Sequence, residues 1–181
     1  MSLETLDAQV TTIRAEAERT QNSYGRTVDS INADTTLSDD GKAIKINAET
    51  ERVKTTLAGL RKKEADLIRA KRTELERRLF GLSSVASADP TQIIAYRDAQ
   101  DRAARLADPD DARELLNTAQ LSDDTSLTSA ILAQSLRNGW HSVVREHTNT
   151  NPRSSEDLND LQQLYDNQNI GLGAALAYAM F

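Results

Sequence analysis

The sequence contains no cysteine, which excludes disulfide bridges and thiolate metal sites. A chain without cysteine fits a reducing compartment, so we expect a soluble intracellular protein. The first residues, Met1 to Glu4, show neither the basic nor the apolar stretch of a secretory signal peptide. The longest apolar stretch, residues 170–181, is too short to span a bilayer, and we therefore expect no membrane association.

Aromatic residues, glycine and proline are also scarce, with one Trp, four Tyr, two Phe, seven Gly and three Pro among 181 residues. This composition is poor in the aromatic residues that favour sheets. The commonest residues are instead helix formers and helix-capping residues. The composition therefore predicts an all-α protein.

The first half of the chain carries the spacing of two long amphipathic helices. Apolar or small residues recur every three or four positions in the first segment: Leu3, Leu6, Val10, Ile13, Ala17, Thr20 and Tyr24. After a break at residues 33–36, Ser38 provides an N-cap for a second helix that should end near Phe80. Two striped helices joined by a short turn favour antiparallel pairing, so we predict a coiled-coil-like helical hairpin over residues 1–82. The sequence leaves open whether the hairpin closes within one chain or between two chains.

The second half is typical of a compact bundle of short helices. Residues 83–88 form a linker rich in Ser and Ala, and the bundle should occupy residues 89–181. Asp89-Pro90 and Asp108-Pro109 each combine an N-cap with proline at the first helical position. A third start signal is Leu121-Ser122-Asp123-Asp124, which repeats the Leu-Ser-Asp-Asp sequence around the Ser38 cap. That third signal should open one helix running to about His147. The predicted bundle core comprises Ile93, Ile94, Tyr96, Leu106, Leu115, Leu116, Leu127, Ile131, Leu136, Trp140, Val143, Val144, Leu158, Leu161 and Leu164.

No arrangement of residues typical of catalysis emerges from the sequence. His141 and His147 lie six positions apart, which points them in different directions on a helix, whereas a zinc pair needs three or four. A calcium loop beginning at Asp108 would need glycine at Arg113 and glutamate at Ala119, so the acidic clusters are better explained as helix caps. The glycines at 171 and 173 are not preceded by a strand, as a dinucleotide loop requires. We therefore predict no catalytic residues, no cofactor and no metal site.

Charge is divided unevenly along the chain, whose net charge is −6. Residues 37–82 hold 12 basic and 8 acidic side chains, whereas residues 83–181 hold 7 and 14. The predicted partner-binding residues of the basic segment are Arg69, Lys71, Arg72, Arg77 and Arg78. These positive charges favour an acidic surface of another protein as the partner. Nucleic acid is disfavoured as a partner because interleaved acidic residues balance the positive charge of this helix and no aromatic residues are available there for stacking on bases. The alternative is a DNA-associated or regulatory coiled-coil protein that uses the basic second helix.

The apolar C-terminal tail has two interpretations. It could close the core of the bundle, which we weigh as the more frequent arrangement for such a segment. It could also insert into a groove of a partner, in which case Tyr178, Met180 and Phe181 would make the contact.

Several short stretches carry a family resemblance. They are the turn Thr35-Thr36-Leu37-Ser38-Asp39-Asp40-Gly41, the run Glu76 to Gly81, Tyr96 to Ala99, Asp110 to Leu116 and Gly139 to Val144. In this order the chain resembles small helical proteins encoded among the structural genes of phages and prophages of actinobacteria.

The resemblance implies a non-enzymatic role in the virion or in head assembly, as a scaffold, a connector or a minor virion component. Its expected partners are other virion or assembly proteins and further copies of the chain. Its expected location is the host cytoplasm during assembly, and the virion itself.

Overall fold

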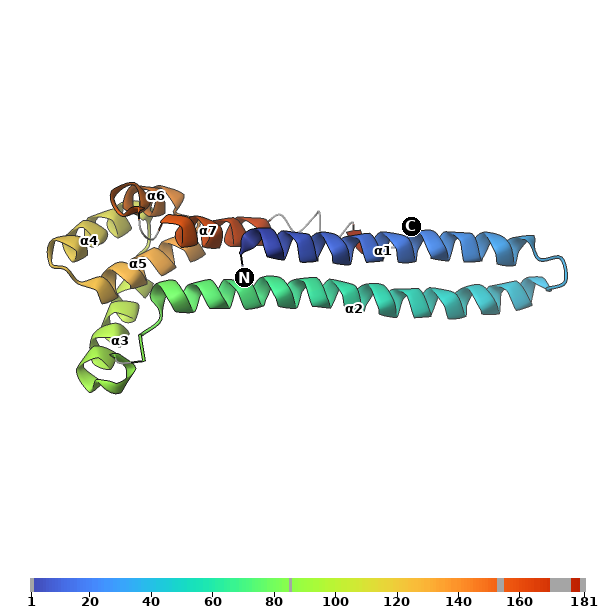
Figure 1. The fold of residues 1–181 in the computed structure, drawn as a ribbon, viewed down its shortest axis with the longest axis horizontal. Helices are drawn as coiled ribbons and strands as arrows, with labels where there is room; N and C mark the ends of the chain where they lie inside the picture. The colour runs from blue at the N-terminus through green and yellow to red at the C-terminus, as the bar shows by residue number, and fades with distance from the viewer. Residues whose placement is uncertain (1, 85, 153–154, 170–176, 180–181) are drawn as a thin grey trace. The chain divides into compact units, whose positions relative to one another are not determined.

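The computed structural model describes residues 2–84, 86–152, 155–169 and 177–179. The predicted all-α class is confirmed, because the described residues form seven α-helices and one short 3-10 helix, without a strand. The two long helices are α1 (Leu3–Ala33) and α2 (Asp39–Phe80), which lie side by side and are joined by a short turn (Figure 1). Both starts follow from capping: the Ser2 hydroxyl accepts from the Thr5 amide, and the Ser38 hydroxyl accepts from the Gly41 amide.

Contacts between α1 and α2 show the antiparallel register of the hairpin. Arg14 contacts Glu64, Tyr24 contacts Thr50, and the ammonium group of Lys42 donates to the carbonyl of Asn32. The residue number on α2 falls as the number on α1 rises, as an antiparallel pair requires. The apolar seam between the helices is narrow and contains Ile13, Ala17, Val53, Leu57 and Leu60.

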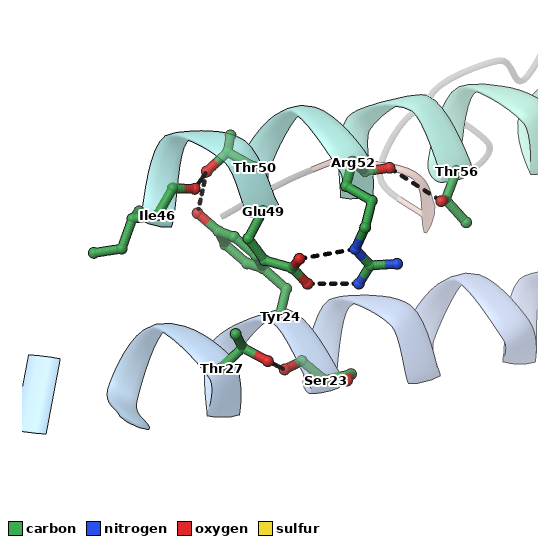
Figure 2. A network of polar contacts seen from close by, with 8 residues as sticks. All are labelled: Ser23, Tyr24, Thr27, Ile46, Glu49, Thr50, Arg52 and Thr56. Carbon is green, nitrogen blue, oxygen red and sulfur yellow. Dashed lines mark hydrogen bonds and ion pairs between the residues drawn. The ribbon is translucent and has the colours of Figure 1, made fainter. Parts of the chain in front are cut away.

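A polar tie supports the seam toward the turn of the hairpin. Figure 2 shows Tyr24 reaching from α1 to Thr50 on α2, with the two hydroxyl oxygens 2.8 Å apart. The Thr50 hydroxyl donates to the carbonyl of Ile46, one turn earlier in the same helix, and so accepts from the phenol. On the same helix, Arg52 and Glu49 form a paired ionic contact three residues apart.

The chain divides into two compact units, one comprising residues 1–71 with 170–181 and the other residues 72–169. This division differs from the predicted boundary at residues 83–88. The last turns of α2 belong to the second unit, where Leu75 and Phe80 are buried. The C-terminal residues 177–179 belong with the hairpin, because Tyr178 joins the hairpin core. The interpretation of the tail as part of the bundle core is therefore wrong for these three residues.

The second unit contains five short helices besides the end of α2 and the 3-10 helix η1 (Ala86–Ala88). They are α3 (Pro90–Ala104), α4 (Pro109–Leu121), α5 (Thr125–Arg137), α6 (His141–Thr150) and α7 (Ser155–Asn169). The predicted caps of α3 and α4 are present, because the carboxylates of Asp89 and Asp108 accept from backbone amides in the first turns. The third start signal is shifted by two residues: Ser122 is the C-cap of α4, and Asp124 caps α5 by accepting from the amide of Leu127.

The prediction of one helix from the start signal at residues 121–124 to about His147 is wrong, because the chain turns between α5 and α6. Gly139 adopts a left-handed φ of 70°. The amide of Trp140 donates to the carbonyl of Ser135 at 2.8 Å, and the amide of Gly139 donates to that of Leu136 at 3.3 Å. These bonds form a Schellman motif, in which glycine after the cap ends the helix.

Helix α5 is the centre of the second unit and packs against α3, α4, α6 and α7. Its buried side chains are Leu127, Ala130, Ile131, Leu132, Ala133, Ser135 and Leu136. Most predicted core residues on α5, α6 and α7 are buried. Ile94 is a wrong prediction, since it is 68% exposed, and α3 instead buries the small residues Ala99 and Ala103. Small side chains allow α3 to approach α5 closely.

Candidate functional site

The most developed polar site of the first unit is centred on Glu64, whose side chain is only 4% exposed. The guanidinium of Arg14 donates to both carboxylate oxygens, from Nη2 to Oε1 at 2.6 Å and from Nε to Oε2 at 3.1 Å. This two-point geometry fixes the plane of the carboxylate and supplies the charge that a buried anion requires.

The C-terminal segment 177–179 binds to the hairpin at this site. The hydroxyl of Tyr178 donates to Oε2 of Glu64, and its ring packs among Ile13, Ala17 and Leu57. On the same side, the Gln21 amide donates to the carbonyl oxygens of Ala177 at 3.3 Å and of Ala179 at 2.6 Å. The hairpin therefore recognises a tyrosine side chain together with the backbone on either side of it. We call Arg14, Gln21, Glu64 and the apolar residues beneath Tyr178 the tyrosine site.

Electrostatics couple the members of this site. Burial alone would raise the pKa of Glu64, but the hydrogen bonds from Arg14 and Tyr178 and the charge of Arg14 outweigh it and lower that pKa. Burial and the hydrogen bond to the Glu64 carboxylate raise the pKa of Tyr178. At neutral pH the site therefore contains a carboxylate, a guanidinium and a neutral phenol.

The predicted binding residues of the basic segment are mostly engaged within the chain. Arg69 lies 3.2 Å from Asp66, which also pairs with Lys62 at 2.5 Å. Lys71, which the sequence also predicts as a partner-binding residue, is only 2% exposed and follows Leu67 in the seam spacing of α2. Its position on the buried stripe of the helix explains this burial.

The remaining predicted cations belong to the second unit. Arg72 lies 3.7 Å from Glu76 and stacks over the ring of Tyr165, with 5.5 Å from its guanidinium carbon to the ring centroid. Arg78 pairs with Asp157 and lies 3.9 Å from Glu74. Arg77 is exposed and, among the described residues, has no carboxylate within ion-pair distance.

The predicted tail contacts have separate outcomes. Tyr178 is buried against the hairpin of its own chain. Met180 and Phe181 lie outside the described residues.

A second polar arrangement surrounds His147 in the second unit. Its Nδ1 lies 3.0 Å from the Gln120 amide nitrogen and 3.5 Å from that of Asn151, so Nδ1 is the unprotonated nitrogen when both amides donate. Burial lowers the pKa of His147. The ring borders an open hollow of about 520 Å³ that Thr125, Thr128 and Leu158 also line.

In the described part of the chain, His, Asp and Glu residues form no group of three or more suited to a metal ion. Nor does any described helix combine the length and apolarity needed to cross a bilayer.

The sequence patterns described above did not predict Arg14, Gln21 or Glu64 as site residues. One signal was available, because the seam of α2 runs through Val53, Leu57, Leu60, Glu64 and Leu67 at alternating steps of three and four. A carboxylate at a seam position requires a partner, and Arg14 beside Ile13 on the facing helix supplies one. Gln21 carried no comparable signal, since its role depends on where the C-terminal segment lies.

Comparisons with models of protein families, with curated proteins and with solved structures give no match to this chain.

Proposed function

We propose that the chain is a non-enzymatic structural or assembly protein of a phage particle, acting through protein–protein contacts. The observation that carries this proposal is the narrow hairpin. In α1, which contains 31 residues, only Leu6, Ile13 and Ala17 are buried. The helix therefore offers most of its length to neighbours, as a protein that bridges other subunits requires.

Exposed apolar side chains on both units support the same proposal. Ile44 on α2 is 70% exposed, and Leu121 at the end of α4 is 90% exposed. Large apolar side chains on charged helices are candidate contact points for partners, although single ones are common on protein surfaces. The assignment to phage particles rests on the resemblance of the sequence stretches described above.

The alternative, a DNA-associated protein, has less support. The basic segment of α2 pairs Lys62, Arg69, Arg72 and Arg78 with nearby carboxylates. Contacts with DNA phosphates would have to replace these internal ion pairs. The binding free energy gained from counterion release would therefore be smaller.

The test is affinity purification of the tagged full chain from cells that are producing particles, after brief chemical crosslinking. We expect capsid, portal or tail proteins to be enriched over a control in which Ile44 and Leu121 are both replaced by Ser. Recovery of nucleic acid with no virion protein would favour the alternative. Recovery of neither would contradict both roles.

A further inference from the structure

The tyrosine site has the features of a built recognition site for a short peptide segment. It contacts the segment 177–179 at three points: an apolar pocket receives the ring, Glu64 accepts from the phenol, and Gln21 donates to two backbone carbonyls. The side chain of Glu64 stays oriented by Arg14 through contacts made entirely within the hairpin. The acceptor for the phenol is therefore positioned by α1 and α2 and not by the bound segment.

The bound segment is remote in sequence from everything that holds it. Tyr178 lies 114 positions from Glu64, and Ala179 lies 158 positions from Gln21. No local turn or helix connects donor and acceptor, so the same contacts are available to an identical segment from another molecule. Exchange of identical elements between copies preserves every contact and is a low-cost route to association.

The surroundings of the segment leave one side open. A hollow of about 610 Å³ borders Tyr178 and Ala179 along α2, where Lys54, Leu57, Ala58 and Arg61 line it. An incoming segment can approach along this hollow without separation of α1 from α2.

From these observations we infer that the tyrosine site is a receptor for the Ala177-Tyr178-Ala179 segment of a second copy of this chain. The segment of the same chain occupies the site in the isolated molecule, and the segment of a neighbour replaces it on association. The inference goes beyond the proposed role in particle assembly, and its test uses the purified chain alone, so failure of one is distinguishable from failure of the other.

The test is complementation between two full-length variants. Tyr178→Ala keeps the site but loses the ring, whereas Glu64→Ala keeps the segment but loses the acceptor. Neither variant can form the complete contact within itself or with its own copies. In a mixture, the segment of the Glu64→Ala chain can occupy the site of the Tyr178→Ala chain. We expect the labelled variants to associate at least tenfold more tightly with one another than with themselves, by fluorescence anisotropy.

The matched control replaces the Glu64→Ala partner with the double variant Glu64→Ala/Tyr178→Ala, whose segment has no tyrosine ring. Its association with Tyr178→Ala should be as weak as the association of each single variant with itself. Circular dichroism should first show that each variant keeps its helix content.

Should Glu64→Ala fail to fold, a peptide of residues 172–181 replaces it as the partner of Tyr178→Ala, with a peptide in which Phe replaces Tyr178 as control. We expect saturable binding that weakens at least tenfold for the Phe peptide. Equal association in mixed and separate variants, or equal binding of both peptides, would overturn the inference.

Discussion

The phenol of Tyr178 donates its hydrogen bond to the carboxylate of Glu64, which Arg14 holds from the opposite helix. This contact joins three distant parts of the chain: the first helix, the middle of the second helix and the C-terminal segment. Tyr24 provides a natural comparison, because its phenol also crosses the hairpin but meets the neutral hydroxyl of Thr50.

Removing the two phenol hydroxyls should therefore have unequal effects. Tyr178→Phe leaves a buried carboxylate with one donor fewer, and we expect it to lower the free energy of unfolding by about 2 kcal/mol. Tyr24→Phe, the matched control, should cost about 0.5–1 kcal/mol because its partner is neutral and only partly buried. Urea unfolding followed by circular dichroism measures both. A larger loss for Tyr24→Phe would contradict the importance assigned to Glu64.

The lowered pKa of Glu64 predicts a loss of stability in acid. The unfolded chain should bind a proton at this residue near pH 4.3, about the ordinary value for glutamate, whereas the folded chain resists protonation until a lower pH. The contribution is thus fully present above that ordinary pKa and disappears as pH falls through the folded value. Melting temperatures of the wild type should fall more steeply than those of Glu64→Gln below about pH 4.5. Parallel curves for the two proteins would refute this assignment.

A second pH effect should arise from His147, whose burial lowers its pKa. Below about pH 6.5, the ordinary value for histidine, the unfolded chain gains a proton that the folded chain resists. Stability of the second unit should therefore decrease as pH falls from that value through the folded pKa. His147→Gln should remove this slope, which thermal melts between about pH 7 and 5 would measure. His141→Gln serves as the control and should retain the slope.

Gly139 and Asp123 both have a left-handed backbone conformation, and substitutions at the two positions should change stability in opposite directions. Gly139 has φ of 70°, and its nearest neighbour for an added Cβ is a flexible His141 atom at 3.8 Å, so Gly139→Ala is limited by backbone strain. We expect it to destabilise the second unit by about 1 kcal/mol. Asp123 occupies the corresponding position after α4, with φ of 53°, and Asp123→Gly should stabilise by about 0.5 kcal/mol or more. Thermal melts that show the same sign for both changes would contradict this explanation.

Much of the fold follows from local sequence signals. The seam spacing and Ser38 predict the hairpin, and Asp89 and Asp108 predict two helix starts because short polar side chains satisfy first-turn amides. The run at residues 121–124 predicts a third start, although the residue that caps it is Asp124 and not Ser122. The turn at Gly139 could also have been recognised, because glycine is the residue that most often follows a helix in a Schellman motif.

The location of the C-terminal segment could not be read from the sequence in the same way. By composition alone, an apolar segment that contains a tyrosine could pack against either unit. Its place depends on Glu64 and Gln21, which are distant in sequence and act through side-chain hydrogen bonds. Lys71 illustrates the converse difficulty, since its charge suggests a surface position whereas the seam spacing places it in the buried stripe.

We propose that this chain acts through protein contacts, beginning with contacts between its own copies. Size-exclusion chromatography with light scattering, on the full chain over a wide concentration range, tests it most directly. We expect a dimeric species that grows with protein concentration in the wild type and is lost in Tyr178→Ala, while Tyr24→Phe keeps it. A wild-type chain that stays monomeric at every concentration, or a dimer that Tyr178→Ala leaves intact, would contradict contact between copies through the tyrosine site.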